Sequence, residues 1–278
     1  MSVTVALGGH AATIHPAIET AIQFAKKLGT KLDGFCALPD PSNAAVDITG
    51  AETVVLGSTA IASMVEAQKV LVQDLSAAFK KQTNAHGAWL QASFEKQVGS
   101  VALHGAAHAA LADVFVVPKE ATQSSHSLNP VFEHVLMETR LPLVLAPSQT
   151  KDSDTCLIAW DGSPLSARAV RMHMPLISSF KTVIVAENAE KVRHQWANAC
   201  EGSAERLTEL LHEQRLNVER VSLEGPVSDA LLDACDAHNV SLAVMGAYGH
   251  TRIGQMLFGG TTSKMLRAET APALALCH

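Results

Sequence analysis

The chain has 278 residues and a formal net charge of −6, with 47% hydrophobic and 17% charged residues. This composition is typical of a globular protein, and the length is enough for two domains. Acidic side chains outnumber basic ones in both halves, by 12 to 9 in residues 1–150 and by 15 to 12 in residues 151–278. Neither half has the basic excess of a protein that binds nucleic acid or an anionic membrane. We therefore expect neither kind of partner.

Strand-like and helical patterns alternate through the first half. Short runs rich in β-branched residues predict strands, and apolar residues three and four positions apart predict helices. The predicted strands are 3–7, 31–38, 88–95, 114–117 and 141–147, and the predicted helices are 15–28, 61–83, 100–111 and 129–139. Gly29 stands where a helix C-cap belongs, and residues 39–59 predict a long loop. Strands that alternate with helices favour a mainly parallel sheet.

The same order of elements returns after residue 150. The predicted strands are 155–160, 182–187, 217–223, 241–246 and 272–277, and the predicted helices are 163–177, 190–215, 228–239 and 261–269. The halves also match in sequence, as in "VGSVALHGAAHAALADVFVV" and "EGPVSDALLDACDAHNVSLAVM". This repeat predicts an α/β protein of two tandem domains, each with a mainly parallel five-stranded sheet flanked by helices. The polar stretch "SQTKDSD", residues 148–154, predicts the boundary.

The final strand of each half, "LPLVLAP" or "PALALC", is apolar. Because exposed apolar edge strands are a hazard unless they are paired, we expect the two halves to pack through these strands as a pseudo-dimer within one chain. Further dimerisation of the whole chain stays open at this point.

Cysteine usage and the N-terminal residues bear on the compartment. The five cysteines lie far apart and form no C-x-x-C pair, which is typical of reduced thiols. The opening "MSVTVALGGH" lacks the basic segment of a signal peptide, and no stretch reaches 18 apolar residues. We expect a soluble cytoplasmic protein.

Three strand ends of the second half carry features that suit a ligand. Asp161 follows the first strand, Ala186 and Glu187 end the second, and Gly246 follows the fourth. In an open parallel sheet, ligands bind beyond the carboxyl ends of strands at the point where the strand order reverses. These positions therefore predict a binding site at one edge of the sheet.

The glycine-rich segment "GAYGHTRIGQMLFGGTTSKML", residues 246–266, suggests what that ligand is. Gly246 and Gly249 can adopt a positive φ and direct main-chain N–H groups at an anion. Gly259 and Gly260 lead into a helix near Thr261, and the N-terminus of a helix favours phosphate. Hydroxyl donors follow at Thr261, Thr262 and Ser263. The segment predicts a site for a phosphorylated ligand.

The spacing Gly246-x2-Gly249-x9-Gly259 resembles the nucleotide-binding signature of the universal stress protein family. "LIAWDGSPLSARAV" is similar to that family's first strand, aspartate and first helix, and "ETAPALAL" to its final strand. The likeness spans the chain as a tandem pair and is stronger in residues 155–277. It implies Rossmann-like domains of the adenine nucleotide alpha hydrolase-like type and an ATP-binding stress-response protein that senses or signals, with slow hydrolysis at most.

The resemblance also implies a role for each position of the site. The part near adenine and ribose comprises Asp161, Ala186 and Met245. The part near ribose and the α-phosphate comprises Gly246 and Gly249. The part near the outer phosphates, where a divalent ion such as Mg²⁺ or Mn²⁺ would accompany ATP, comprises Gly259, Gly260, Thr261 and Thr262. Gly260 departs from the family, which usually has Ser or Thr there, so a main-chain donor is kept and a hydroxyl is lost.

The first half departs much further from this pattern. Gly8 takes the place of Asp161, Pro118 removes a main-chain donor, and no glycine occurs from residue 118 to residue 140. Without glycine the main chain cannot easily approach a pyrophosphate. We expect residues 1–150 to be a degenerate domain that binds no nucleotide, and residues 151–278 to bind one ATP.

Simpler interpretations compete with these assignments. The glycine segment can be a flexible turn before a capped helix, and Ser163 with Pro164 makes "DGSP" a helix start on its own. His104 and His108 have the i, i+4 spacing of zinc ligands but lack the glutamate of a zincin, and solvated histidines are the alternative.

No catalytic triad and no P-loop G-x4-G-K-[ST] stands out in the sequence, which argues against fast phosphoryl transfer. Besides an ATP-binding protein, two other functions fit the pattern. One is a protein-interaction module of the same fold without tight nucleotide binding. The other is an adenylating or flavin-linked enzyme on a related fold.

Overall fold

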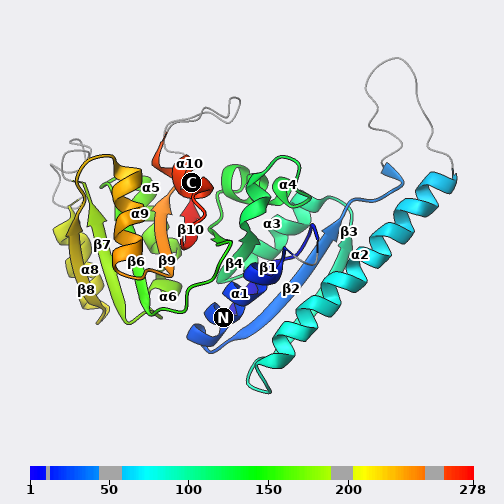
Figure 1. Cartoon of the computed structure of the whole chain (residues 1–278), viewed down its shortest axis with the longest axis horizontal. Coiled ribbons are helices and arrows are strands. Elements are labelled where there is room, and N and C mark those ends of the chain that lie inside the picture. The colour runs from blue at the N-terminus through cyan, green and yellow to red at the C-terminus, as the bar shows by residue number, and fades with distance from the viewer. Residues whose placement is uncertain (11–12, 44–57, 189–202, 248–259) are drawn as a thin grey trace, which may run out of the picture.

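The computed structural model describes residues 1–10, 13–43, 58–188, 203–247 and 260–278 (Figure 1). Its centre is a ten-stranded sheet with the order β3-β2-β1-β4-β5-β10-β9-β6-β7-β8. Five parallel strands come from each half of the chain, and the two sets meet at β5 and β10, the one antiparallel pair in that order. The predicted α/β class is therefore confirmed.

The described part of the first half contributes β1 to β5 and four α-helices. Its strands are β1 (Ser2–Ala6), β2 (Lys31–Leu38), β3 (Ala92–Val98), β4 (Val114–Pro118) and β5 (Leu143–Ala146). Its helices are α1 (His15–Leu28), α2 (Ser58–Ala85), α3 (Val101–Leu111) and α4 (Asn129–Glu133), with a 3₁₀ turn η2 (Lys119–Thr122) and a π-helical turn η3 (His134–Glu138).

The second half repeats this order after the connection that ends at Asp154. Its strands are β6 (Thr155–Trp160), β7 (Thr182–Glu187), β8 (Asn217–Ser222), β9 (Leu242–Gly246) and β10 (Ala273–Cys277). Its described helices are α5 (Pro164–Met172), α6 (Met174–Ile177), α8 (Ala204–Glu213), α9 (Val227–Ala237) and α10 (Thr261–Arg267).

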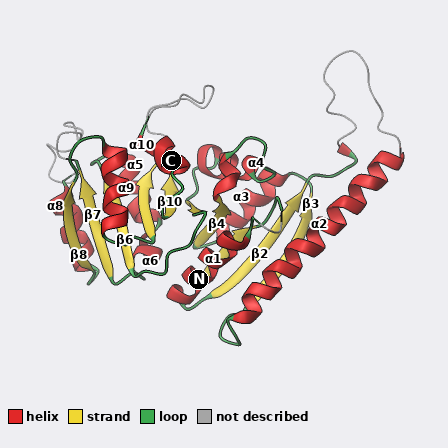
Figure 2. Cartoon of the chain, viewed as in Figure 1, coloured by secondary structure: helices red, strands yellow, loops and turns green. Residues whose placement is uncertain are grey.

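Helices cover both faces of the sheet, which gives three layers (Figure 2). Side chains of α1, α2, α5, α6 and α8 form one core cluster with the strand residues of one face. The other cluster combines the alternate strand residues, which point to the opposite face of the sheet, with side chains of α3, α4, η3, α9 and α10. This alternation follows from the period of two along a strand, and it explains why the inner strands are apolar on both faces.

Helix α1 shows how local sequence sets these elements. Pro16 lies in its first turn, where the missing N–H costs nothing. Ile18, Ile22 and Ala25 form one buried face. Gly29 ends the helix in the left-handed conformation at φ 59°, and its N–H donates to main-chain oxygens of the last turn. The predicted C-cap at Gly29 is confirmed.

The two halves join through their final strands. Leu145 lies opposite Leu274, Val144 opposite Ala275 and Leu143 opposite Leu276. All six side chains are buried, and each pair belongs to the same core cluster. Each core cluster therefore continues from one half into the other, and the predicted pairing of the final strands is confirmed.

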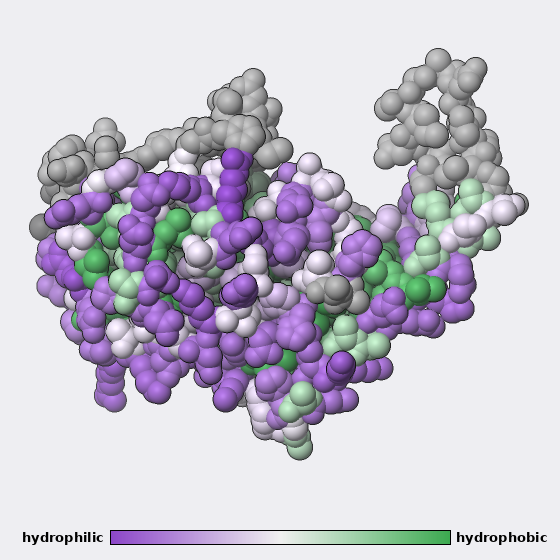
Figure 3. Space-filling view, in the orientation of Figure 1, coloured by the Kyte–Doolittle hydropathy of each residue, from purple (hydrophilic) through white to green (hydrophobic). Residues whose placement is uncertain are grey.

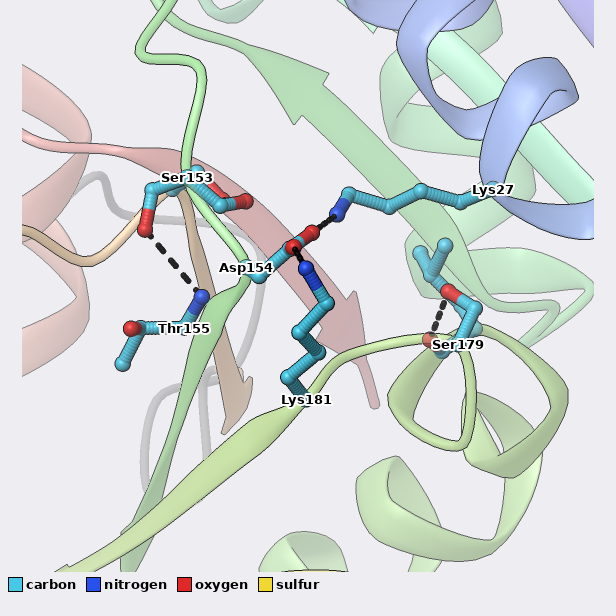
Figure 4. A network of polar contacts seen from close by, with 8 residues as sticks. Lys27, Ser153, Asp154, Thr155, Ser179 and Lys181 are labelled. Atoms are coloured by element: carbon cyan, nitrogen blue, oxygen red, sulfur yellow. Dashed lines mark hydrogen bonds and ion pairs between the residues drawn. The ribbon is translucent and has the colours of Figure 1, made fainter.

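An ion cluster fixes the connection between the halves (Figure 4). Asp154 pairs with Lys27 of α1 and, at 2.5 Å, with Lys181, which precedes β7. The main-chain oxygen of Asp154 accepts from the N–H groups of Lys181 and Thr182. Hydrogen bonds from Lys181 and Lys27 lower the pKa of the Asp154 carboxyl to about 2. The start of β6 is thereby tied to a helix of the first half.

Three predicted elements differ from those found. The predicted helix 163–177 divides at His173, because Pro175 cannot donate the N–H that a continuous helix needs. β3 begins at Ala92 instead of residue 88, because Gly87, at φ 79°, starts a turn after α2. The predicted helix 129–139 is α4 followed by the π-helical turn η3.

Two predicted segments extend beyond the described residues. The predicted loop 39–59 lies largely outside them, and of the predicted helix 190–215 the described part is α8.

The visible face of the molecule is mainly polar, with smaller apolar areas (Figure 3). Within the described ranges, no helix combines the length and apolar character that crossing a membrane requires.

Candidate functional site

The strand order reverses between β6 and β9. From β6 the chain moves outward to β7 and β8, and then returns to β9 on the other side of β6. Ile158 lies opposite Val244 in the β6–β9 pair, so the turn that follows Trp160 lies level with Gly246. The carboxyl edge at such a reversal is where open α/β sheets bind ligands. The structure therefore brings two predicted site positions, Asp161 and Gly246, to this edge.

Asp161 is exposed and shapes the turn between β6 and α5. Its Oδ1 accepts a hydrogen bond of 2.9 Å from the N–H of Ser163, and Gly162 between them has φ 69°. Ser163 then caps α5, because its Oγ accepts from the N–H of Ser166 at 3.2 Å. The helix start that "DGSP" predicted is thus present. The turn before the helix uses only one carboxylate oxygen of Asp161. The exposed carboxylate can still accept a hydrogen bond from a ligand hydroxyl.

Gly246 differs from the sequence-based expectation. The sequence allowed it a positive φ, but it ends β9 and is not among the residues with positive φ. A Cβ at this position would lie 2.9 Å from the carbonyl carbon of Leu165 and 3.0 Å from the nitrogen of Ser166. Glycine is needed here because the first turn of α5 packs directly on the end of β9.

Ala186 and Met245 lie in the core, with 1% and 4% of their surfaces exposed. Both side chains belong to the cluster on the side of α9 and α10. Ala186 pairs with Ala159 and Val221 of the neighbouring strands. A ligand at the carboxyl edge would therefore meet these two positions through the main chain.

Gly260 and the first turn of α10 make up the third part of the site. Gly260 is the N-cap of α10 and is fully extended, at φ 163° and ψ 159°, with open space where a Cβ would stand. Thr261 and Thr262 are partly exposed in the first turn. Helix α10 connects the parallel strands β9 and β10. Its N-terminus therefore lies on the side of the sheet where β9 ends, which is the carboxyl edge. Gly249 and Gly259 lie outside the described residues.

The same edge holds contacts of Glu187, which the sequence already indicated, and of Ala247 and His278, which it did not. His278 Nδ1 lies 3.0 Å from the main-chain oxygen of Ala247, and the N–H of Ala247 donates to the oxygen of Cys277. Glu187, at the end of β7, pairs with Arg220 at 2.6 Å. These contacts fix the strand ends. They join residues distant in sequence, so no local pattern predicts them.

The equivalent edge of the first half is filled by the chain itself. The N–H of Gly9 donates to Ser127 Oγ at 3.0 Å. A Cβ at Gly8 would lie 2.8 Å from Ser127 Oγ and 2.9 Å from Leu128 Cγ. A Cβ at Gly9, which has φ 78°, would lie 2.7 Å from Nε2 of His126, and burial lowers the pKa of that histidine. The segment after β4 therefore covers the end of β1.

No metal site accompanies these residues in the described parts of the chain, where no three or more His, Cys, Asp or Glu side chains are grouped to hold an ion. The two histidines with metal-ligand spacing have other contacts. His108 stacks on Phe35 with a centroid distance of 4.1 Å, and its Nε2 lies 3.2 Å from Glu95 Oε1. Nε2 of His104 lies 3.0 Å from the position that a Cβ on Gly99 would occupy.

Residues 153–276 match the sequence model of the Universal stress protein family. This match identifies the second half of the chain as a domain of that family. The match falls on the half that holds Asp161 and the glycine segment.

Universal stress protein Slr1230 of Synechocystis sp. is 25% identical over 167 residues. These residues are 58% of this chain and 57% of that relative, so the alignment spans less than two thirds of the relative's length.

Solved structures show the same fold. A universal stress protein from Archaeoglobus fulgidus matches with a TM-score of 0.62 at 14% identity, over 99% of this chain and 97% of its own. A functionally unknown protein from Pseudomonas aeruginosa PAO1 matches with a TM-score of 0.50 at 12% identity, over 99% of this chain and 92% of its own. The universal stress protein fold thus extends over both halves.

Proposed function

We propose that this chain is a universal stress protein that binds one ATP per chain, at the carboxyl edge of β6 and β9, and acts in the cytoplasm in the stress response as a nucleotide-dependent sensor or signalling module. The observation that carries the proposal is the contact between Gly246 and the first turn of α5. It brings the Asp161 turn to the end of β9, at the point where the strand order reverses.

The residues present suit an anionic ligand. Main-chain N–H groups of Gly260, Thr261 and Thr262 lie in the first turn of α10, and such groups have no partner within their own helix. The two threonines add hydroxyl donors. The space beside Gly260 is open, whereas the space beside Gly246 is taken by α5. We therefore assign phosphate binding to the start of α10 with Gly249 and Gly259, and not to Gly246.

Each remaining residue has a part in holding the nucleotide. Asp161 would accept a hydrogen bond from a ribose hydroxyl. The main chain at Ala186 and Met245 would line the base. A divalent ion such as Mg²⁺ or Mn²⁺ would neutralise phosphate charge when bound with ATP. We assign no residue to general acid or base chemistry, so hydrolysis would be slow.

The first half would bind no nucleotide, because His126, Ser127 and Leu128 already pack against the end of β1. This gives a second reason for the expected degeneracy of residues 1–150, besides the lack of glycine. The division into a degenerate domain, 1–150, and a binding domain, 151–278, is part of this proposal.

Mass spectrometry of ligand released from purified, denatured protein tests the proposal first. We expect an adenine nucleotide. Calorimetry with ATP then tests the site through two variants of one residue. Asp161→Asn keeps the acceptor for the Ser163 N–H and removes the charge, while Asp161→Ala removes both. We expect Asp161→Ala to weaken binding by about 1–3 kcal/mol and Asp161→Asn to weaken it less.

The proposal fails if the purified protein releases no nucleotide on denaturation and calorimetry shows that the folded protein does not bind ATP. The alternative, an interaction module of the same fold, would then be favoured. ATP turnover well above the uncatalysed rate would instead favour an enzyme.

A further inference from the structure

Lys119 joins the first half of the chain to the last helix of the second half. It is the first residue of η2, directly after β4, and its Nζ donates a hydrogen bond to the main-chain oxygen of Ala268. Ala268 is the C-cap of α10. Pro118 lies opposite Ala146 of β5, and β5 pairs with β10, so the Lys119 side chain crosses the border between the halves. Helix α10 lies next to this border (Figure 1).

The charge of Lys119 suits the end of α10. The last carbonyl groups of a helix have no partner within the helix and carry partial negative charge, so a lysine is favourable there. Lys119 is partly buried, and burial lowers its pKa, while the carboxylates of Glu120 and Glu269 act in the opposite direction. The ammonium group therefore faces negative charge from both halves of the chain.

The main chain that carries Lys119 is held on the first half. The side-chain amide of Asn129, which is 8% exposed, donates to the main-chain oxygen of Ala121 at 3.0 Å. The N–H of Gln123 donates to the oxygen of Glu120 at 2.9 Å. Because these hydrogen bonds fix η2, the contact of Lys119 ties α10 to the packed part of the first half.

Helix α10 depends on such external contacts. It has 7 residues, and so short a helix is not stable through its internal hydrogen bonds alone. Met265 and Leu266 pack into the core, and Lys264 pairs with Asp229 of α9. These contacts all lie within the second half. Lys119 adds a donor from the other half, at the C-terminal end of the helix.

The sequence repeat shows that this contact is not symmetric. In the alignment of the two halves, Lys119 corresponds to Ala247, whose side chain is too short to reach the other half. Ala247 is buried, and its main-chain oxygen lies 3.0 Å from Nδ1 of His278. At this pair of positions the contact therefore runs only from the first half to the second. Where the first half lacks the glycine segment, it has a lysine that holds its neighbour.

We propose that the first half supports the nucleotide site of the second half by holding α10 through Lys119. The inference rests on the proposed function, in which the start of α10 binds phosphate. A helix that is fixed at its C-terminal end needs less ordering when a ligand binds at its start. Because coupling between two sites is reciprocal, a nucleotide that orders α10 strengthens the contact of Lys119 with Ala268 by the same factor.

Hydrogen exchange of the whole chain tests the contact without nucleotide. Lys119→Met keeps an apolar side chain of similar length and removes the donor, whereas Lys119→Arg keeps a donor. We expect amides in the last turn of α10 to exchange about tenfold faster in Lys119→Met than in the wild type, and amides of α8 to be unchanged. Lys119→Arg should restore much of the protection. Lys81→Met, which changes an exposed lysine of α2, should behave like the wild type.

Calorimetry and lysine labelling test the coupling to nucleotide. We expect Lys119→Met to weaken ATP binding about fivefold, at the low end for coupling between sites, and Lys119→Arg to weaken it less. In the wild type, ATP should slow the acetylation of Lys119 by acetic anhydride and leave the labelling of Lys81 unchanged. A residue that only stabilised the fold would not show this effect of ATP on its own reactivity.

Each part of the inference has its own contradicting result. Unchanged α10 exchange in Lys119→Met overturns the contact. Faster α10 exchange with unchanged ATP affinity and unchanged labelling of Lys119 overturns the coupling. A wild-type chain that binds no ATP overturns the proposed function and the coupling with it, whereas the exchange result still decides whether Lys119 holds α10.

Discussion

Gly246 lies so close to Leu165 that a Cβ on the glycine would stand 2.9 Å from both the carbonyl carbon and the Cβ of Leu165. This contact sets how β9 and α5 meet. It also shows that Gly246, the first glycine of the segment, makes room for helix α5. We therefore expect the phosphates of a ligand to approach the later glycines.

Gly246→Ala should therefore destabilise the protein by roughly 1–3 kcal/mol, the usual cost of overpacking. Thermal unfolding of the variant against the wild type measures this. Gly260→Ala is the matched control, because Gly260 is extended and has open space beside it. A Gly246→Ala protein as stable as the Gly260→Ala protein would show that α5 can move away at little cost.

Gly260→Ser should stabilise the chain by a few tenths of a kcal/mol, because serine at an N-cap can accept from the first N–H groups of a helix. Gly260 is the N-cap of α10, and no side chain caps that helix. The variant also supplies the hydroxyl that the resemblance to the universal stress protein signature predicts at this position. The melting temperature relative to Gly260→Ala measures the cap. A serine variant less stable than the alanine variant would contradict it.

His173 should make stability fall in acid. It is 2% exposed, its Nε2 hydrogen-bonds the main-chain oxygen of Leu276 at 3.1 Å, and burial lowers its pKa from 6.5 to about 4. Between these values the unfolded state binds a proton more readily than the folded state. Stability is therefore lost as pH falls from about 6.5 and levels off below about 4. The total loss is on the order of 3 kcal/mol.

Urea unfolding at several pH values tests this expectation. His173→Gln keeps a donor for Leu276 and cannot titrate, so its stability should change less over the same window. The exposed His10→Gln should behave like the wild type. If the wild type and His173→Gln lose stability in parallel from pH 6.5 to pH 4, another group is responsible.

Asp154→Asn should weaken the connection between the halves. The Asp154 carboxylate, about half exposed, pairs with Lys27 and Lys181. Its pKa is lowered from 3.8 to about 2, so its contribution is present above pH 3.8 and is lost as pH falls through about 2. Because solvent screens the pair, we expect a loss of only about 1 kcal/mol at neutral pH.

Salt-dependent unfolding measures that contribution. The difference between the wild type and Asp154→Asn should shrink at high salt. Asp152→Asn, an exposed carboxylate two residues earlier, is the control. An equal effect of the two substitutions would mean that the ion cluster at Asp154 has no special role.

The sequence predicts the fold well where the pattern is local. Alternating periods identify most elements, and the apolar final strands identify the pair of β5 and β10. What the sequence could not show depends on contacts between distant residues. The packing of Leu165 on Gly246, and of Ser127 and Leu128 on Gly8, joins segments about 80 to 120 residues apart. The glycine count alone therefore could not show that Gly246 also makes room for a helix.

Gly8→Asp tests the closed edge of the first half. The substitution restores the residue type of Asp161, but its Cβ would stand 2.8 Å from Ser127 Oγ and 2.9 Å from Leu128 Cγ. We expect lower stability and no second nucleotide site. Calorimetry that finds two ATP per chain for this variant would show that the segment after β4 moves aside readily.

Titration calorimetry of the wild-type chain with ATP decides whether the second half alone binds nucleotide. We predict a stoichiometry of one and an affinity that is unchanged in Thr122→Ala of the first half and weakened at least ~10-fold, or about 1.4 kcal/mol, in Gly249→Val of the second. A stoichiometry of two, no binding by folded protein, or a Gly249→Val chain that binds like the wild type would contradict it.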